Sequence, residues 1–293
     1  SAKTIYQFDL SSPYDITAAA RTYNNVSYSL VTHAPESHEW NNDGTKIFTY
    51  ASNNTIYEHN LSTAYDLSTA SYNNVNFYFG ATANNSRGFS FNADGTQLFV
   101  GNAGNNLIYI YNLSTGFDLS SASYSNTTVS PSGMSQAPNS LIFNSNGSKV
   151  FIYEYSQKIL EYNLTTPYDL TSMSAYVTSL GVYPQESQAR SFTFNGDMSK
   201  FFVLGPGNDT IYQYSTGGAK PFLVQQRIYL NSSDQNNYAG TGVTISGDGN
   251  TAAVGIPNRK HDTYDTPGSV LVWTNTPTHY NIASGTRTDF TTT

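Results

Sequence analysis

The chain has 293 residues, a formal net charge of −7 and only 11% charged residues. Its 13 Lys and Arg residues form no cluster, which argues against a nucleic-acid-binding protein. The absence of cysteine excludes disulfides, thiolate catalysis and cysteine-ligated zinc, and no apolar run is long enough to insert in a membrane as a helix. The 24 tyrosines and 16 phenylalanines, set among Asn, Ser, Thr and Gly, indicate an all-β protein.

Three markers recur with a period of about 51 residues. The first is an Ile-Tyr pair or its Ile-Leu equivalent, at Ile5, Ile56, Ile108, Ile159 and Ile211. The second is an acidic turn of YDI, YDL or FDL type, at Asp15, Asp66, Asp118 and Asp169. The third is a DG-type turn, at Asp43, Asp94, Asn146, Asp197 and Asp248. A shared period predicts copies of one supersecondary unit.

Residues 86–136 illustrate the unit. Two short alternating segments, RGFSF and QLFVG, flank the NADGT turn, and LIYIYN and a weaker strand ending near Val129 follow. Four strands in about 50 residues cannot bury both faces alone, so the copies must stack radially. We therefore predict a single β-propeller domain over 1–293 with about six four-stranded blades. Its repeats are 1–35 (partial), 36–85, 86–136, 137–187, 188–235 and 236–293.

Equivalent positions of the repeats predict the core between blades. One column is aromatic or aliphatic, and a second, two residues earlier, lies on the same face of the strand. The first column comprises Trp40, Phe91, Phe143, Phe194 and Ile245, and the second comprises His38, Phe89, Leu141, Phe192 and Val243. His38 is therefore expected to be a buried core histidine rather than a metal ligand, although His33, Glu36 and Glu39 are close in sequence.

The last repeat differs from the others. It reads NNYAGTGVTISGDGNTAAVGIPN, followed by the insertion RKHDTYDTPG and the segment GSVLVWTN. This resembles the FG-GAP repeat of integrin-type propellers. Members of that family often carry a DxDxDG calcium loop, which Asp234, Asn236 and Tyr238 do not complete. No metal site is therefore carried over from the resemblance.

The first four units resemble repeats of phage and marine bacterial surface proteins. The matching segments read IYQFDLSSPYDITAA, IYEHNLSTAYDLSTASY, IYIYNLSTGFDLSSASY and ILEYNLTTPYDLTSMS. The resemblance implies a propeller of tail-fibre, appendage or surface-layer type, located outside the cell, on its surface or on a virus particle. The role it implies is structural and adhesive.

The sequence does not supply equal numbers of the two halves of a blade. Six third-and-fourth-strand units are present but only five first-and-second-strand units, and 286–293 is too short for the missing hairpin. We expect either a continuation of the polypeptide beyond Thr293 or, as an alternative function, a self-assembling subunit completed by a neighbour's strand.

The DG and YDL turns are expected to be structural, whereas the opposite loops vary between repeats and should bind a partner. That partner is a surface glycan, a protein receptor or a neighbouring structural subunit. The hypothesised binding residues are Glu36, Asn53, Arg87, Asn105, Asn139, Tyr155, Arg190, Asn208, Asp209, Arg259 and His261.

The sequence contains no serine-hydrolase motif and no catalytic acid pair outside the turns, so we expect no enzyme and no cofactor. A propeller hydrolase or lactonase is the remaining alternative. Among the N-x-S/T sequons, three share one column of the repeat and are possible glycosylation sites: Asn60, Asn112 and Asn163.

Overall fold

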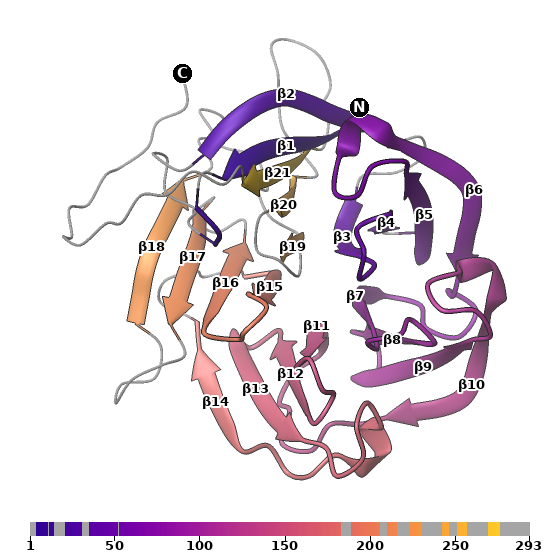
Figure 1. Ribbon diagram of the computed structural model, residues 1–293. Coiled ribbons are helices and arrows are strands. Elements are labelled where there is room, and N and C mark those ends of the chain that lie inside the picture. Colours follow the sequence, from indigo (N-terminus) through magenta and orange to yellow (C-terminus); the bar gives the residue numbers. More distant parts are fainter. Residues whose placement is uncertain are drawn as a thin grey trace. The chain divides into compact units, whose positions relative to one another are not determined.

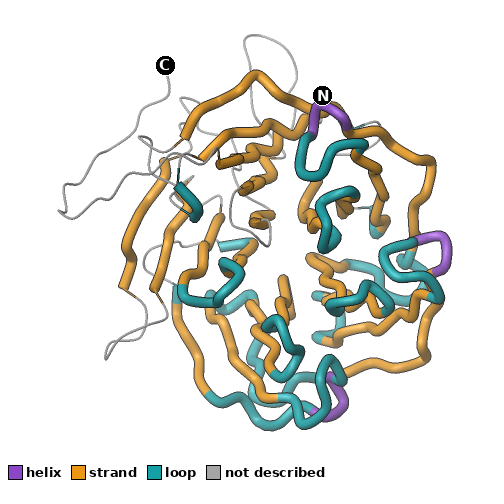
Figure 2. The backbone as a smooth tube through the Cα atoms, viewed as in Figure 1, coloured by secondary structure: helices purple, strands orange, loops and turns teal. Residues whose placement is uncertain are grey.

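The computed structural model describes residues 4–10, 12–14, 21–30, 35–51, 53–182, 189–205, 210–215, 223–229, 242–245, 251–256 and 269–275. In this part of the chain, strands predominate and the helical segments are three short 3-10 turns (Figure 2). The chain forms two compact units. The first comprises 1–35, 65–68 and 185–293, and the second comprises 36–64 and 69–184.

The second unit contains three antiparallel four-stranded sheets, in which each strand pairs with the next along the chain. In the first sheet these are β3 (Pro35–Trp40), β4 (Lys46–Ala51), β5 (Thr55–Leu61) and β6 (Ala70–Tyr78). The next sheet has β7 (Ser86–Phe91), β8 (Gln97–Asn102), β9 (Leu107–Leu113) and β10 (Ala122–Val129). The third has β11 (Pro138–Phe143), β12 (Lys149–Glu154), β13 (Lys158–Asn163) and β14 (Thr178–Gly181). The 3-10 turns η2 (Leu67–Thr69), η3 (Leu119–Ser121) and η4 (Leu170–Ser172) precede the fourth strands. Within this unit the first strand of each sheet is innermost and the fourth is outermost (Figure 1).

The place of a strand in its sheet decides how many of its faces are buried, and the pattern of apolar residues in the strand follows from that. In β8, Leu98, Phe99 and Val100 are all fully buried, because both faces of an inner strand are covered by neighbouring blades. The outer strand β6 instead alternates partly buried and exposed residues and ends at Tyr78, which is 61% exposed. Inner strands therefore lose the alternation that outer strands keep.

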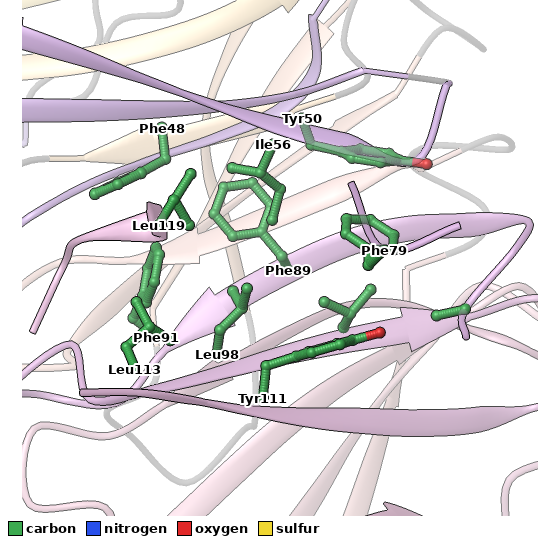
Figure 3. Packing of buried hydrophobic residues seen from close by; sticks show 12 residues of the cluster. Phe48, Tyr50, Ile56, Phe79, Phe89, Phe91, Leu98, Tyr111, Leu113 and Leu119 are labelled. Carbon is green, nitrogen blue, oxygen red and sulfur yellow. The ribbon is translucent and has the colours of Figure 1, made fainter. Parts of the chain in front are cut away.

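The core between the first two blades of this unit is aromatic. Figure 3 shows Phe48 and Tyr50 of β4 facing the strands of the next blade. The rings of Phe48 and Phe91 have centroids 4.8 Å apart. Trp40 and Phe91 are buried, as their column predicted, and His38 is 4% exposed. Phe91 belongs to the core between the two blades, as its column predicted.

Two glycines allow the next blade to approach closely. A Cβ atom on Gly88 would lie 2.4 Å from the backbone oxygen of Asn139, and one on Gly101 would lie 2.7 Å from that of Pro138. Any side chain at these positions would displace β11, so backbone contact between the blades depends on glycine.

The first unit contains one four-stranded and one five-stranded sheet. The four-stranded sheet comprises β15 (Ser191–Phe194), β16 (Lys200–Gly205), β17 (Thr210–Ser215) and β18 (Leu223–Tyr229). The other has the order β19 (Gly242–Ile245), β20 (Thr251–Ile256), β21 (Ser269–Asn275), β1 (Thr4–Leu10) and β2 (Arg21–Ser29). Here β1 pairs antiparallel with β2 and parallel with β21, so that Ile5 lies opposite Val270.

The fold is an all-β β-propeller with four-stranded blades, as predicted. The prediction of about six blades is wrong: the described residues form four four-stranded blades and the single five-stranded sheet. The reason is the β1–β21 pair, which joins the partial first repeat to the last repeat in one sheet. The segment 286–293, on which the expected ring closure depended, lies outside the described residues.

Candidate functional site

The three blades of the second unit have two different ends. The turn end carries the DG-type turns and the YDL-type loops. The loop end carries the second-to-third-strand loops and the loops between blades, which are residues 53–54, 79–85, 103–106, 130–137 and 155–157. Each end can be assessed by how its polar groups are bonded.

At the turn end the DG turns bond to themselves. Asp94 Oδ1 accepts hydrogen bonds from the hydroxyl of Thr96 at 2.6 Å and from its backbone N–H at 3.0 Å. The hydroxyl bond is the largest of the causes that lower the pKa of the Asp94 carboxyl. Asp43 with Thr45, and Asn146 with Ser148, make the same pair of bonds. The turn residues are thus engaged locally, as Asx turns are.

The YDL-type loop folds over the DG turn of its own blade. Phe117 N–H donates to the Gly95 carbonyl at 3.0 Å, and Tyr168 N–H donates to that of Gly147 at 2.9 Å. Both aromatic residues adopt left-handed backbone angles, with φ of 56° and 61°. A Cβ atom on Gly95 would lie 2.4 Å from the Phe117 ring, so the aromatic residue and the glycine are required together.

The preceding blade holds this loop as well. Glu58 Oε2 accepts from the N–H of Leu119, at the start of η3, at 3.0 Å. Lys46 Nζ donates to the Phe117 carbonyl at 2.7 Å and lies 2.6 Å from Glu58 Oε1. In the first unit, Gln7 Oε1 accepts from Leu67 N–H at 2.9 Å in the equivalent way. These side chains therefore hold the YDL-type loops at Leu67 and Leu119 by hydrogen bonds from a neighbouring sheet.

At the loop end the backbone is also held, but by residues that differ from blade to blade. Asn102 Nδ2 donates to the Asn84 carbonyl at 2.8 Å. In the next blade the equivalent residue is Glu154, which is 1% exposed and accepts from Ser135 N–H at 2.8 Å and Gln136 N–H at 3.2 Å. Sequence reasoning missed both anchors; the available signal was a polar residue ending an apolar strand.

Two predicted binding residues project from these anchored loops. Tyr155 is 53% exposed, while its backbone N–H donates to the Ala137 carbonyl at 3.0 Å. Asn105 is exposed, and its Nδ2 donates to the Tyr109 hydroxyl at 2.8 Å. Asn53 is partly buried and bonds the Tyr57 hydroxyl in the same way, at 3.0 Å. The loops at this end thus present side chains from a fixed backbone.

The predicted column of polar residues begins the first strands of the blades. Burial raises the pKa of Tyr50, the nearby charge of Glu36 raises it further and that of Arg87 lowers it, so both charges lie near its hydroxyl. Asn139, by contrast, is only 4% exposed, and its Oδ1 has no hydrogen-bond partner in the described part of the chain. The charges of Glu36 and Arg87 therefore both act on Tyr50, whereas Asn139 is buried.

The remaining predicted residues are separate from this group. Arg190 belongs to the other compact unit and is partly buried, and its N–H donates to the Leu204 carbonyl at 2.8 Å. Asn208, Asp209, Arg259 and His261 lie outside the described residues. The three sequon residues Asn60, Asn112 and Asn163 are exposed at the ends of third strands.

The histidine and acidic residues of β3 face different surroundings. Beside the buried His38, Glu39 directs Oε1 to the next blade, where it accepts from Ser90 Oγ at 3.3 Å and Phe91 N–H at 3.4 Å. Burial raises the pKa of Glu39 from 4.5 to about 8. Among the residues with a described position, no three His, Asp or Glu side chains are grouped so as to hold a metal ion.

The fold defines this chain as a β-propeller, and in its second unit the polar groups of one end bond to one another while the loops of the other end expose side chains. No protein-family model and no curated protein matches the sequence. Among solved structures, the Cps50 (Swd1) β-propeller domain of Myceliophteria thermophila is similar at 10% identity and a TM-score of 0.43. The match covers 78% of this chain and 64% of that domain. A functionally unknown protein of Desulfotomaculum acetoxidans is similar at 15% identity and a TM-score of 0.46, over 75% of this chain and 72% of that protein.

In the described residues, no helix is both long and apolar enough to cross a bilayer.

Proposed function

We propose that this propeller is a non-catalytic binding module, exposed outside a cell or on a virus particle, that binds a surface glycan through its loop end. The observation that carries the proposal is the contrast in bonding between the two ends. Polar groups of the turn end bond to one another, while Asn105 and Tyr155 project from anchored loops.

The chemistry of the loop end suits a sugar. A tyrosine ring offers an apolar face with a polar tip, and amide side chains both donate and accept hydrogen bonds. Loops rich in Tyr, Asn, Ser and Gly are typical of binding surfaces, because they combine rigid aromatic contacts with adaptable polar ones. Here Asn84, Asn85 and Asn106 are exposed alongside Asn105 and Tyr155.

The hydrogen bonds of Glu154, the buried carboxylate at the end of β12, favour a binding role over hydrolysis. Glu154 accepts two backbone N–H bonds and the hydroxyl of Ser135 at 3.1 Å, and it also contacts the Ser156 hydroxyl. A carboxylate occupied by four donors anchors a loop and has no lone pair directed at a substrate.

A glycan array screened with the full chain tests the proposal. We expect specific binding, and a roughly tenfold loss for Tyr155→Ala and for Asn105→Ala. Asn112→Ala, an equally exposed asparagine at the turn end, is the matched control and should bind as the wild type does. Absence of glycan binding, or binding unchanged in both loop-end variants, would show that the proposal is wrong. Binding to protein receptors but to no glycan would also show that the proposal is wrong.

A further inference from the structure

In the first blade of the second unit, three reactive side chains meet on neighbouring strands. Lys46 lies on β4, Glu58 on β5 and Asn73 on β6 (Figure 1). One oxygen, Glu58 Oε1, lies 2.6 Å from Lys46 Nζ and 2.7 Å from Asn73 Nδ2. Glu58 is 2% exposed, so the carboxylate that the other two groups share is shielded from bulk water, while the Lys46 side chain is 25% exposed.

The strand geometry that creates this meeting is a β-bulge. The register between β5 and β6 shifts at Tyr57 and His59, so the segment 73–75 lies opposite Glu58. Asn74 takes the extra position with a left-handed φ of 64°. The bulge directs Asn73 at the carboxylate, in keeping with the general use of bulges to re-aim a side chain.

We propose that Lys46 and Asn73 become joined by an intramolecular isopeptide bond, with Glu58 as the proton carrier. The bond forms between Lys46 Nζ and Asn73 Cγ, and the bond between Cγ and Nδ2 breaks. Two protons leave Nζ and pass through Glu58 to Nδ2, which departs as ammonium. The reaction needs no oxidant, reductant or cofactor.

The contacts of each group match its part in this reaction. Glu58 Oε1 touches both the nitrogen that loses protons and the nitrogen that gains them, which is the geometry that general acid–base transfer requires. The N–H of Val75 donates to Asn73 Oδ1 at 3.0 Å and would stabilise the negative charge that develops there on attack. The Phe117 carbonyl, 2.7 Å from Nζ, orients the lysine.

The other blades of this unit lack part of the group. The next blade has Gln97, Ile110 and Ser125 at the equivalent positions and therefore has neither nucleophile nor carboxylate. The third blade keeps a Lys149–Glu161 ion pair, but Thr178 stands opposite Glu161 and no asparagine is bonded to it among the described contacts. Lys149 is thus an internal control: it has the base and lacks the acceptor.

The bond would tie β4 to β6 across β5. In a chain without cysteine it would act as a disulfide does, by restricting the unfolded state. This inference does not rest on glycan binding, because it depends only on contacts inside the blade.

Intact-mass spectrometry of the purified full chain tests the proposal. The expected mass is lower than that of the sequence by one ammonia, and proteolysis should yield one branched peptide joining Lys46 to Asn73. The variants Lys46→Arg, Glu58→Gln and Asn73→Ala should each show the full mass, whereas Lys149→Arg should still show the loss. Circular dichroism establishes that each variant is folded.

A further variant checks the chemistry without removing the acceptor. Asn73→Asp should lose water instead of ammonia and reach the same final mass as the wild-type protein. A folded wild-type protein at full mass would overturn the proposal. So would a loss of ammonia that persists in Lys46→Arg or maps to another residue.

Discussion

The turn end and the loop end of the second unit are built from the same strands, yet they differ in how they are bonded. At the turn end, all three blades repeat the Asx turn, and the second and third blades repeat an aromatic residue over a glycine. The loop of the second blade is also held by Glu58 of the first. At the loop end, the anchors change from Asn102 to Glu154 and the exposed residues change with them.

This difference in bonding distinguishes the contacts that build the fold from the loops to which we assign the proposed binding. Contacts that close the turns within each blade tolerate few solutions and so repeat with the period of the fold. Loops that are merely held in place by their neighbours are free to vary. Repetition in this chain therefore marks structure, and variation on an anchored backbone marks the surface to which we assign the proposed binding role.

The two ends should differ most in how they tolerate a methyl group added to a glycine. Gly95→Ala should destabilise the protein by ~2–4 kcal/mol, because the position has a φ of +71° and its Cβ would lie 2.5 Å from the backbone nitrogen of Phe117. At the loop end, the nearest atom to a Cβ on Gly104 is the Asn102 side-chain oxygen at 3.0 Å, so Gly104→Ala should cost at most about 1 kcal/mol. Urea denaturation measures both. Equal losses would contradict the distinction.

A second prediction concerns pH, because folding raises the pKa of Glu39 and lowers the pKa of turn aspartates such as Asp94. The folded-state pKa of Glu39 is raised from 4.5 to about 8, so the folded protein holds this proton more tightly than the unfolded chain. Stability should therefore fall as pH rises from about 4.5 to about 8, by ~2–4 kcal/mol in all. The pKa of Asp94 is lowered from 3.8, so its contribution is lost only in acid, in a separate window.

Glu39→Gln removes the titrating group and keeps the hydrogen-bonding shape of the protonated acid. Its stability should match that of the wild-type protein near pH 5 and exceed it above pH 8, by about the amount given above. Denaturant midpoints at several pH values provide the measurement. A wild-type profile that stays flat across this range would refute a buried, protonated Glu39.

Local pattern and repetition were sufficient for much of the fold. The period of about 51 residues, with two-residue alternation inside it, specifies four strands per blade and the core position of residues such as Phe91. The number of blades was not available in this way. It depends on the pairing of β1 with β21, which joins segments more than 250 residues apart, and no local signal encodes such a pairing.

The candidate site was predicted only in part, for a similar reason. The exposure of Asn105 and Tyr155 was predicted because exposed residues lie where repeats differ. The same argument selected Asn139, which is only 4% exposed. The hydrogen bond from Leu119 N–H to Glu58 joins residues 61 positions apart. It could not be predicted from the sequence, because it depends on how two blades pack.

The smallest expected effect comes from two tyrosines of one blade, 13 positions apart and at opposite ends. Tyr168 adopts a left-handed φ of 61° and donates its hydroxyl proton to the Ser145 carbonyl at 3.0 Å, and its ring centroid lies 5.2 Å from that of Phe143 in a tilted contact. Tyr168→Ala should therefore cost about 1–2 kcal/mol. Tyr155→Ala should change stability by no more than about 0.5 kcal/mol, because that side chain is 53% exposed and its backbone bond to Ala137 is retained. Thermal unfolding of the two variants in parallel measures the contrast. If Tyr155→Ala proved as destabilising as Tyr168→Ala, the exposed tyrosine would be part of the scaffold, and the division between an assembly end and a recognition end would not hold.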